Sequence, residues 1–140
     1  MGTTVCVLSG GDPLKRTDLL GLIRHGKSRG LRMATIPAAT PLLTWHVVQA
    51  LKDAGLDQMA LSLDASTPEA HDRFRGAQGA FKKTLEAVHW AHDAQLPVQI
   101  NSVMSQHNFA DVDQLIELVQ RLGIVFWEVF FLVPVGRGAE

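Results

Sequence analysis

The chain contains very little cysteine: Cys6 is the single thiol among its 140 residues. One thiol excludes an internal disulfide framework and suits a reducing compartment, so we expect a cytoplasmic protein. Long hydrophobic runs are also missing, because none approaches the ~20 residues that a membrane-spanning helix needs. The opening residues 1–4 lack the charged-then-apolar order of a signal peptide. A membrane is therefore not an expected partner.

The chain also lacks an excess of charge of either sign. Its formal net charge is -1, and the lysines and arginines form no cluster. Nucleic acid is therefore not an expected partner. No low-complexity segment or linker interrupts the sequence, so residues 1–140 are expected to form a single domain.

What the chain does have is a regular alternation of strand and helix patterns. Near-continuous apolar runs are typical of parallel strands that are buried on both faces. They occupy 5–9, 31–36, 59–64, 98–103 and 126–133. Apolar residues recur at helical spacing between them, most clearly at Val112, Leu115, Val119 and Leu122. The pattern predicts an α/β fold with about five parallel strands and four or five helices.

Two architectures fit this alternation: a doubly wound open sheet and part of a (β/α) barrel. Five strands cannot close an eight-stranded barrel. In either architecture the first and last strands are left as edges, with unpaired backbone groups along one side. We therefore expect the protein to form a homo-oligomer through its exposed sheet edges.

Polar residues gather where these strands end, which is where both architectures bind ligands. Ser62 and Asp64 alternate with apolar neighbours on one strand, and Asn101 has the same phase on the next. Thr35 ends the second strand, and the pair Gly10-Gly11 follows the first. Glycine has no Cβ, so another molecule can approach this backbone closely. Together these groups predict a polar cup for a small polar ligand.

Several motifs resemble those of radical S-adenosylmethionine (radical SAM) enzymes. Gly10-Gly11-Asp12-Pro13 resembles the GGEP motif of the family. Ser62-Leu63-Asp64, the run 71–76 and Gly79-Ala80-Phe81 resemble the SLD…HDRxRG…GSF pattern of its cofactor-maturation and peptide-modifying branch. That branch includes synthases of molybdenum cofactor, pyrroloquinoline quinone and haem. Residues 131–138 are similar to the end of the family's sixth strand, so the resemblance runs from about residue 5 to the last residue.

This resemblance implies both a fold and a chemistry. The family fold is a partial (β/α)₆ barrel, of which this chain would form strands two to six, with the first βα unit missing. Family members bind S-adenosylmethionine (SAM) on a [4Fe-4S] cluster and cleave it reductively to a 5′-deoxyadenosyl radical. The implied function is thus the SAM-binding part of an iron–sulfur oxidoreductase that acts on an unknown small molecule or peptide in cofactor or peptide maturation.

The resemblance also implies which residues bind the cofactor. Gly10, Gly11 and Asp12 would lie beside the methionine amino group of SAM, and Asn101 near the nucleoside. Ser62 and Asp64 would lie near the ribose and the carboxylate, and the last strand would touch the adenine. The complete expected set is Gly10, Gly11, Asp12, Pro13, Thr35, Ser62, Asp64, Arg75, Asn101, Val133, Pro134 and Val135.

The chain departs from the family pattern in one decisive respect, because the cluster-binding C-x₃-C-x₂-C motif is absent. A [4Fe-4S] cluster needs several thiolates, and Cys6 alone cannot supply them. We therefore expect no metal-ligating or catalytic residue here, and no activity from this chain alone. Two smaller departures are Asp12 in place of Glu, and residues 35–40 in place of the usual Thr-Thr-Asn-Gly turn.

Two other functions remain open at this stage. One is a half-barrel or flavodoxin-like domain that binds a phosphate or nucleotide at its βα turns. The other is a non-catalytic fragment that persists only as an oligomeric scaffold. Anaerobic reconstitution of a cluster in a longer parent protein would separate the radical SAM function from the phosphate- or nucleotide-binding alternative.

Overall fold

The computed structural model describes residues 2–132 and contains one sheet of five parallel strands. The strands are β1 (Val5–Leu8), β2 (Arg32–Thr35), β3 (Gln58–Ser62), β4 (Val98–Met104) and β5 (Phe126–Phe131). The helices are α1 (Leu19–Ser28), α2 (Trp45–Asp53), α3 (Pro68–Arg75), α4 (Ala80–Asp93) and α5 (Val112–Arg121). Two short 3₁₀ turns, η1 (Pro13–Lys15) and η2 (Phe109–Asp111), precede α1 and α5. The predicted α/β fold is confirmed.

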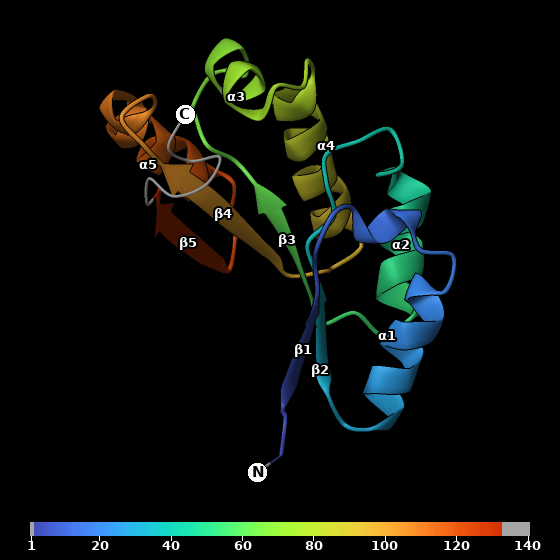
Figure 1. Ribbon diagram of the computed structural model, residues 1–140. Coiled ribbons are helices and arrows are strands. Elements are labelled where there is room, and N and C mark those ends of the chain that lie inside the picture. The colour runs from blue at the N-terminus through green and yellow to red at the C-terminus, as the bar shows by residue number, and fades with distance from the viewer. Residues whose placement is uncertain (1, 133–140) are drawn as a thin grey trace.

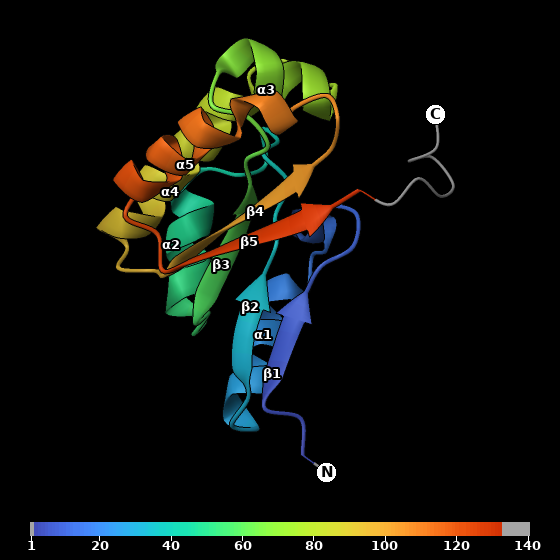
Figure 2. The same ribbon diagram turned by 90° about the vertical axis from the view of Figure 1, so that its left-hand side faces the viewer.

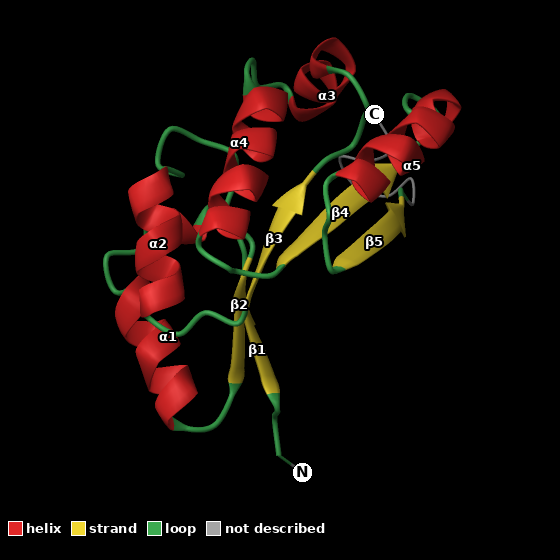
Figure 3. Ribbon diagram, turned by 180° about the vertical axis from the view of Figure 1, so that it is seen from behind, coloured by secondary structure: helices red, strands yellow, loops and turns green. Residues whose placement is uncertain are grey.

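The strand order decides between the two architectures. The strands lie in the sheet in the order in which they occur in the sequence, β1-β2-β3-β4-β5. A doubly wound sheet reverses direction at a switch point and carries helices on both faces. Here the helices pack against one face of a curved sheet (Figures 1 and 3), and Figure 2 looks onto the opposite, concave face. The molecule is therefore a half-barrel.

The core lies between the helices and the convex face of the sheet. Leu61 and Leu63 are buried there, and Ile100 on β4 is completely buried beside them. Side chains alternate along a strand, so Gln99 and Asn101 of β4 face the concave side and are only half-buried. The predicted phase of these two strands is confirmed.

The long interval between β3 and β4 holds two helices. Thr67 caps the N-terminus of α3 by accepting a hydrogen bond from the Ala70 backbone N–H at 3.3 Å, and Pro68 follows at its first position. Gly76 ends this helix in the left-handed conformation, with φ of 62°. Between these two ends α3 lies above the carboxyl ends of the strands, and α4 runs back along the sheet (Figure 1).

Both edges of the sheet carry exposed apolar side chains. β1 pairs only with β2, and β5 only with β4, within residues 2–132. Val5 and Val7 on β1 are 49% and 51% exposed, and Phe126 on β5 is 54% exposed. In the same part of the chain, no helix has the length and hydropathy needed to cross a membrane.

Candidate functional site

A cavity of about 300 Å³ opens at the carboxyl ends of β1, β2 and β3. This volume lies in the range of sites that hold small molecules. The β1–α1 loop, the β2–α2 loop, the end of β3 and the helix α3 surround it. Its polar or bare-backbone lining residues are Ser9, Gly10, Gly11, Thr40, Ser62, His71 and Arg75. Three of the expected strand-end residues, Gly10, Gly11 and Ser62, thus meet Arg75 in one place.

The glycine pair supplies bare backbone to this cavity. Gly10 has φ of 124°, a conformation that a residue with a side chain rarely adopts. A Cβ on Gly10 or Gly11 would meet no protein atom within 4 Å, so the space beside them is open. Carbonyl and N–H groups of this loop are therefore available to a ligand.

Asp12 fixes the shape of the same loop. Its Oδ1 accepts hydrogen bonds from the backbone N–H of Leu14 at 3.1 Å and of Ala38 at 3.4 Å. Its Oδ2 accepts from Thr40 Oγ1 at 3.0 Å. The carboxylate thus ties the β1–α1 loop to the β2–α2 loop, and Pro13, which is buried, begins η1 directly after it. Neither residue is among those that line the cavity.

Thr35 has a structural position rather than a place in the cavity. It is completely buried, and its Oγ1 donates a hydrogen bond to the Leu8 carbonyl at 3.0 Å. This bond joins the end of β2 to the end of β1 just below the glycine pair. Asn101 does not line the cavity either, but it is the in-register neighbour of Ser62, which does.

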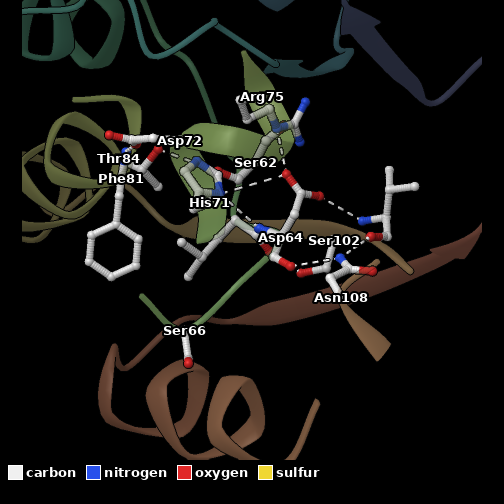
Figure 4. A network of polar contacts seen from close by, with 12 residues as sticks. Ser62, Asp64, Ser66, His71, Asp72, Arg75, Phe81, Thr84, Ser102 and Asn108 are labelled. Carbon is white, nitrogen blue, oxygen red and sulfur yellow. Dashed lines mark hydrogen bonds and ion pairs between the residues drawn. The ribbon is translucent and has the colours of Figure 1, made fainter. Parts of the chain in front are cut away.

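Asp64 lies outside the cavity and is buried in a polar network (Figure 4). Its Oδ1 accepts from the Val103 backbone N–H at 2.8 Å, and its Oδ2 accepts from Arg75 Nε at 2.5 Å. Its carbonyl accepts from Asn108 Nδ2 at 2.7 Å. A buried carboxylate needs such partners, because burial without them is costly. In the structure this carboxylate holds Arg75, which lines the cavity.

Arg75 is the charged group that reaches the ligand space. Asp64 engages only its Nε, so the two terminal nitrogens of the guanidinium remain as donors. The side chain is 34% exposed, whereas its Asp64 partner is fully covered. An arginine held in this way offers a paired set of donors that matches a carboxylate or a phosphate.

His71, one turn before Arg75 on α3, also lines the cavity and is buried. Its Nδ1 accepts a hydrogen bond from the Asp64 backbone N–H at 3.0 Å, which requires an unprotonated Nδ1 and places the proton on Nε2. The Asp64 carboxylate lies 3.7 Å from the same nitrogen, but with a neutral ring this contact is no ion pair. Burial lowers the pKa of His71, despite the opposing effect of Asp64.

We expect the His71→Asn variant to lose a pH dependence that the natural chain shows. The unfolded chain protonates its histidines near pH 6.5, whereas folded His71, with its lowered pKa, stays neutral. The unfolded state then binds more protons, so the free energy of unfolding falls as the pH drops below about 6.5. Asparagine keeps an acceptor near the position of Nδ1 and does not titrate. Urea unfolding at pH 7.5, 6.5 and 5.5 tests this, and an equal decline in both proteins would contradict it.

Asp72, on α3, binds the backbone at the start of the next helix, α4. Its carboxylate accepts from the backbone N–H of Gly79 at 2.6 Å and of Phe81 at 2.8 Å, at the N-terminus of α4. The hydrogen bond from Phe81 and then that from Gly79 lower the pKa of Asp72. The side chains of His71 and Asp72 thus both bind backbone groups outside their own segment, residues 67–76.

The residues that line the cavity are not all in the set expected from the sequence. The expected set lacks three polar cavity residues, Ser9, Thr40 and His71. Ser9 and His71 lie beside or within motifs that carry the family resemblance, whereas Thr40 lies in residues 35–40, which depart from the family pattern. A histidine that precedes an aspartate and two arginines on one short helix was the available signal for His71. Val133, Pro134 and Val135, which are expected to contact the adenine, lie outside the described residues.

The residues present do not fit an iron–sulfur cluster. Cys6 is the single thiol of the sequence, and it lies on β1 with its side chain packed against the core. Residues 2–132 contain no group of three histidine, cysteine or acidic side chains that could hold a metal ion. The same residues do fit SAM, because the cavity joins bare backbone, a hydroxyl and a guanidinium.

Comparison with known proteins identifies the family. The Radical SAM superfamily matches residues 1–134. The chain is 41% identical over all 140 residues to an AdoMet-dependent heme synthase of Methanosarcina barkeri, of which it covers 40%. It is 37% identical over 115 residues, 82% of this chain, to a PqqA peptide cyclase of Rhizobium meliloti, of which it covers 30%. The chain thus spans two fifths or less of the length of these relatives.

Solved structures agree at the level of the fold. Streptococcus suis SuiB bound to S-adenosylmethionine superposes with a TM-score of 0.77 at 14% identity, over 91% of this chain and 29% of that protein. Methylornithine synthase (PylB) gives 0.79 at 15% identity, over 92% and 39%. The chain therefore belongs to the radical SAM superfamily, in its cofactor- and peptide-maturation branch, and that superfamily uses SAM and a [4Fe-4S] cluster.

Proposed function

We propose that this chain is the SAM-binding part of a radical SAM oxidoreductase and corresponds to strands two to six of its partial barrel. The observation that carries the proposal is the cavity in which Arg75, fixed by buried Asp64, faces the bare backbone of Gly10 and Gly11. An α-amino acid group presents an ammonium and a carboxylate side by side. The cavity offers carbonyl acceptors for the first and guanidinium donors for the second.

The chain's own residues then bind and orient the cofactor. Gly10 and Gly11 would accept from the ammonium, and Arg75 would hold the carboxylate. Ser62, at the end of β3, would contact the ribose, and Asn101 the nucleoside. When bound, SAM would supply the radical chemistry that defines the family. Because the single thiol cannot ligate a cluster, we infer that this chain alone does not cleave SAM.

For the substrate we propose a tetrapyrrole, with a peptide as the second candidate. The support for the first is the 41% identity over the entire chain to a protein named AdoMet-dependent heme synthase. The second rests on the lower identity, over fewer residues, to PqqA peptide cyclases.

We expect SAM to bind the isolated chain, and Arg75→Met to weaken that binding by tenfold to a hundredfold. The variant removes charge-assisted hydrogen bonds, each worth about 1.5–3 kcal/mol, to the ligand carboxylate. Isothermal titration calorimetry measures the affinity, and circular dichroism verifies that the variant is folded. Arg73→Met is the matched control, because Arg73 lies on the same helix but does not line this cavity.

Two outcomes would overturn the proposal: wild-type chain that takes up no SAM, or Arg75→Met that binds as tightly as Arg73→Met. Ser62→Ala gives a second measure that leaves the Asp64 network intact, with a loss of a few fold expected. Titration with inorganic phosphate or ATP covers the alternative of a phosphate- or nucleotide-binding domain. Tighter binding of either of these than of SAM would favour that alternative.

A further inference from the structure

A row of hydrogen-bonded polar side chains crosses the concave face of the sheet. Gln58 Nε2 on β3 donates to Gln99 Oε1 on β4 at 2.6 Å. Gln99 Nε2 donates to Asn101 Oδ1 at 2.6 Å and to Glu128 Oε2 on β5 at 2.9 Å. All four side chains are half-buried and occupy the face opposite the helices. The SAM-binding residues proposed above do not account for Gln58, Gln99 or Glu128.

Glu128 sets the direction of this row. A carboxylate only accepts hydrogen bonds, so the Gln99 side chain must turn its N–H₂ toward Glu128. The Gln99 oxygen then faces Gln58, and the same N–H₂ group also donates to the Asn101 oxygen. With its oxygen engaged in this way, Asn101 keeps its own N–H₂ for another partner. Without an acceptor-only group at one end, every amide in the row could be flipped and the same number of hydrogen bonds would form.

Asn101 lies next to the candidate ligand site. It is the in-register neighbour of Ser62, which lines the cavity. Neighbouring strands are about 4.8 Å apart, so Asn101 lies one strand beyond Ser62 and the cavity wall, where the proposed function places the nucleoside of SAM. Its other neighbour in the register is Glu128 on β5. The identity of the group that Asn101 presents therefore affects what the site accepts.

We infer that Glu128 is a positioning residue for the ligand site: through Gln99, it fixes the Asn101 amide so that its N–H₂ group is offered to the ligand. The inference rests on the proposed function and adds a rule of specificity. The ligand atom that faces Asn101 must be a hydrogen-bond acceptor, such as a ribose oxygen or an adenine ring nitrogen of SAM.

The double variant Gln99→Glu, Glu128→Gln tests the direction of the row without removing a hydrogen bond. The carboxylate moves to β4, where it accepts from Gln58, from Asn101 and from the new amide on β5. Size and net charge stay the same, but the Asn101 oxygen is now free instead of its N–H₂ group. We expect the SAM affinity to fall about tenfold or more, because an acceptor then faces an acceptor.

The matched control is Gln114→Glu, Glu117→Gln, a charge-conserving exchange at two exposed positions of α5 that should leave the affinity unchanged. Glu128→Gln alone lets the amides of the row adopt either orientation, so the SAM affinity should fall by an intermediate amount. If the Gln99/Glu128 exchange binds SAM like the wild type, the row is only structural and the inference is wrong. A wild-type chain that fails to bind SAM contradicts the proposed function instead.

A spectroscopic readout tests the direction of the row independently of SAM. In ¹H–¹⁵N spectra of the wild type, the Gln99 side-chain N–H₂, held by a carboxylate and a carbonyl, should be shifted downfield and protected from exchange. The Asn101 N–H₂ should not be. The exchange of Gln99 and Glu128 should transfer both properties to Asn101. A wild-type spectrum in which Asn101 is the protected amide would overturn the inference.

Discussion

Replacing Asp64 by alanine is expected to lower the free energy of unfolding by about 2–4 kcal/mol, because hydrogen bonds to a charged group contribute about 1.5–3 kcal/mol each and the one from Val103 is lost inside the protein. The change leaves the Val103 backbone N–H and Arg75 Nε without their acceptor. Total stability of a domain is only about 5–15 kcal/mol, so much of it is lost. Urea unfolding followed by circular dichroism measures the effect.

Two further variants make this expectation specific to the network. Asp64→Asn keeps one oxygen for Val103 but places an N–H₂ group against Arg75, so we expect a smaller loss than with alanine. Asp93→Ala, at the exposed end of α4, should change the stability by less than about 0.5 kcal/mol. An Asp64→Ala protein as stable as Asp93→Ala would show that the network does not stabilise the fold.

Self-association of the isolated chain is the second large effect that we expect. β1 and β5 each pair on one side only within residues 2–132, and exposed Val5, Val7 and Phe126 border these edges. Strand edges that carry apolar side chains pair readily with other strands. Light scattering behind size exclusion at micromolar concentration should give a mass at least twice the 15.3 kDa of one chain.

Charge placed on one edge should reverse the association. Val5→Lys with Val7→Lys puts two lysines on β1, which is how natural proteins protect such edges, and should shift the mass toward 15.3 kDa. Trp45→Lys removes an exposed apolar side chain on α2, away from both edges, and should leave the association unchanged. A sharp monomer peak from the unmodified chain would mean that both edges are protected.

Local patterns were enough to predict the strands, the helices and much of the cavity. The alternation of Leu61 and Leu63 with Ser62 gave the correct face for each, because side chains along a strand point to opposite faces in turn. The open space beside Gly10 and Gly11 was also predictable, because glycine has no Cβ and leaves its backbone uncovered. These patterns alone fit both a doubly wound sheet and a half-barrel, and the family resemblance implied the half-barrel that the strand order confirms.

The sequence by itself determined the family, the element types and the residues that gather at the carboxyl ends of the strands. Only the tertiary structure decided which partner each polar group takes. Asp64 turns toward Arg75 and the Val103 N–H, away from the cavity, because β4 lies beside it in that register. Glu128 meets Gln99 across 29 residues of sequence for the same reason. Register between strands is a long-range property, so no local pattern contains it.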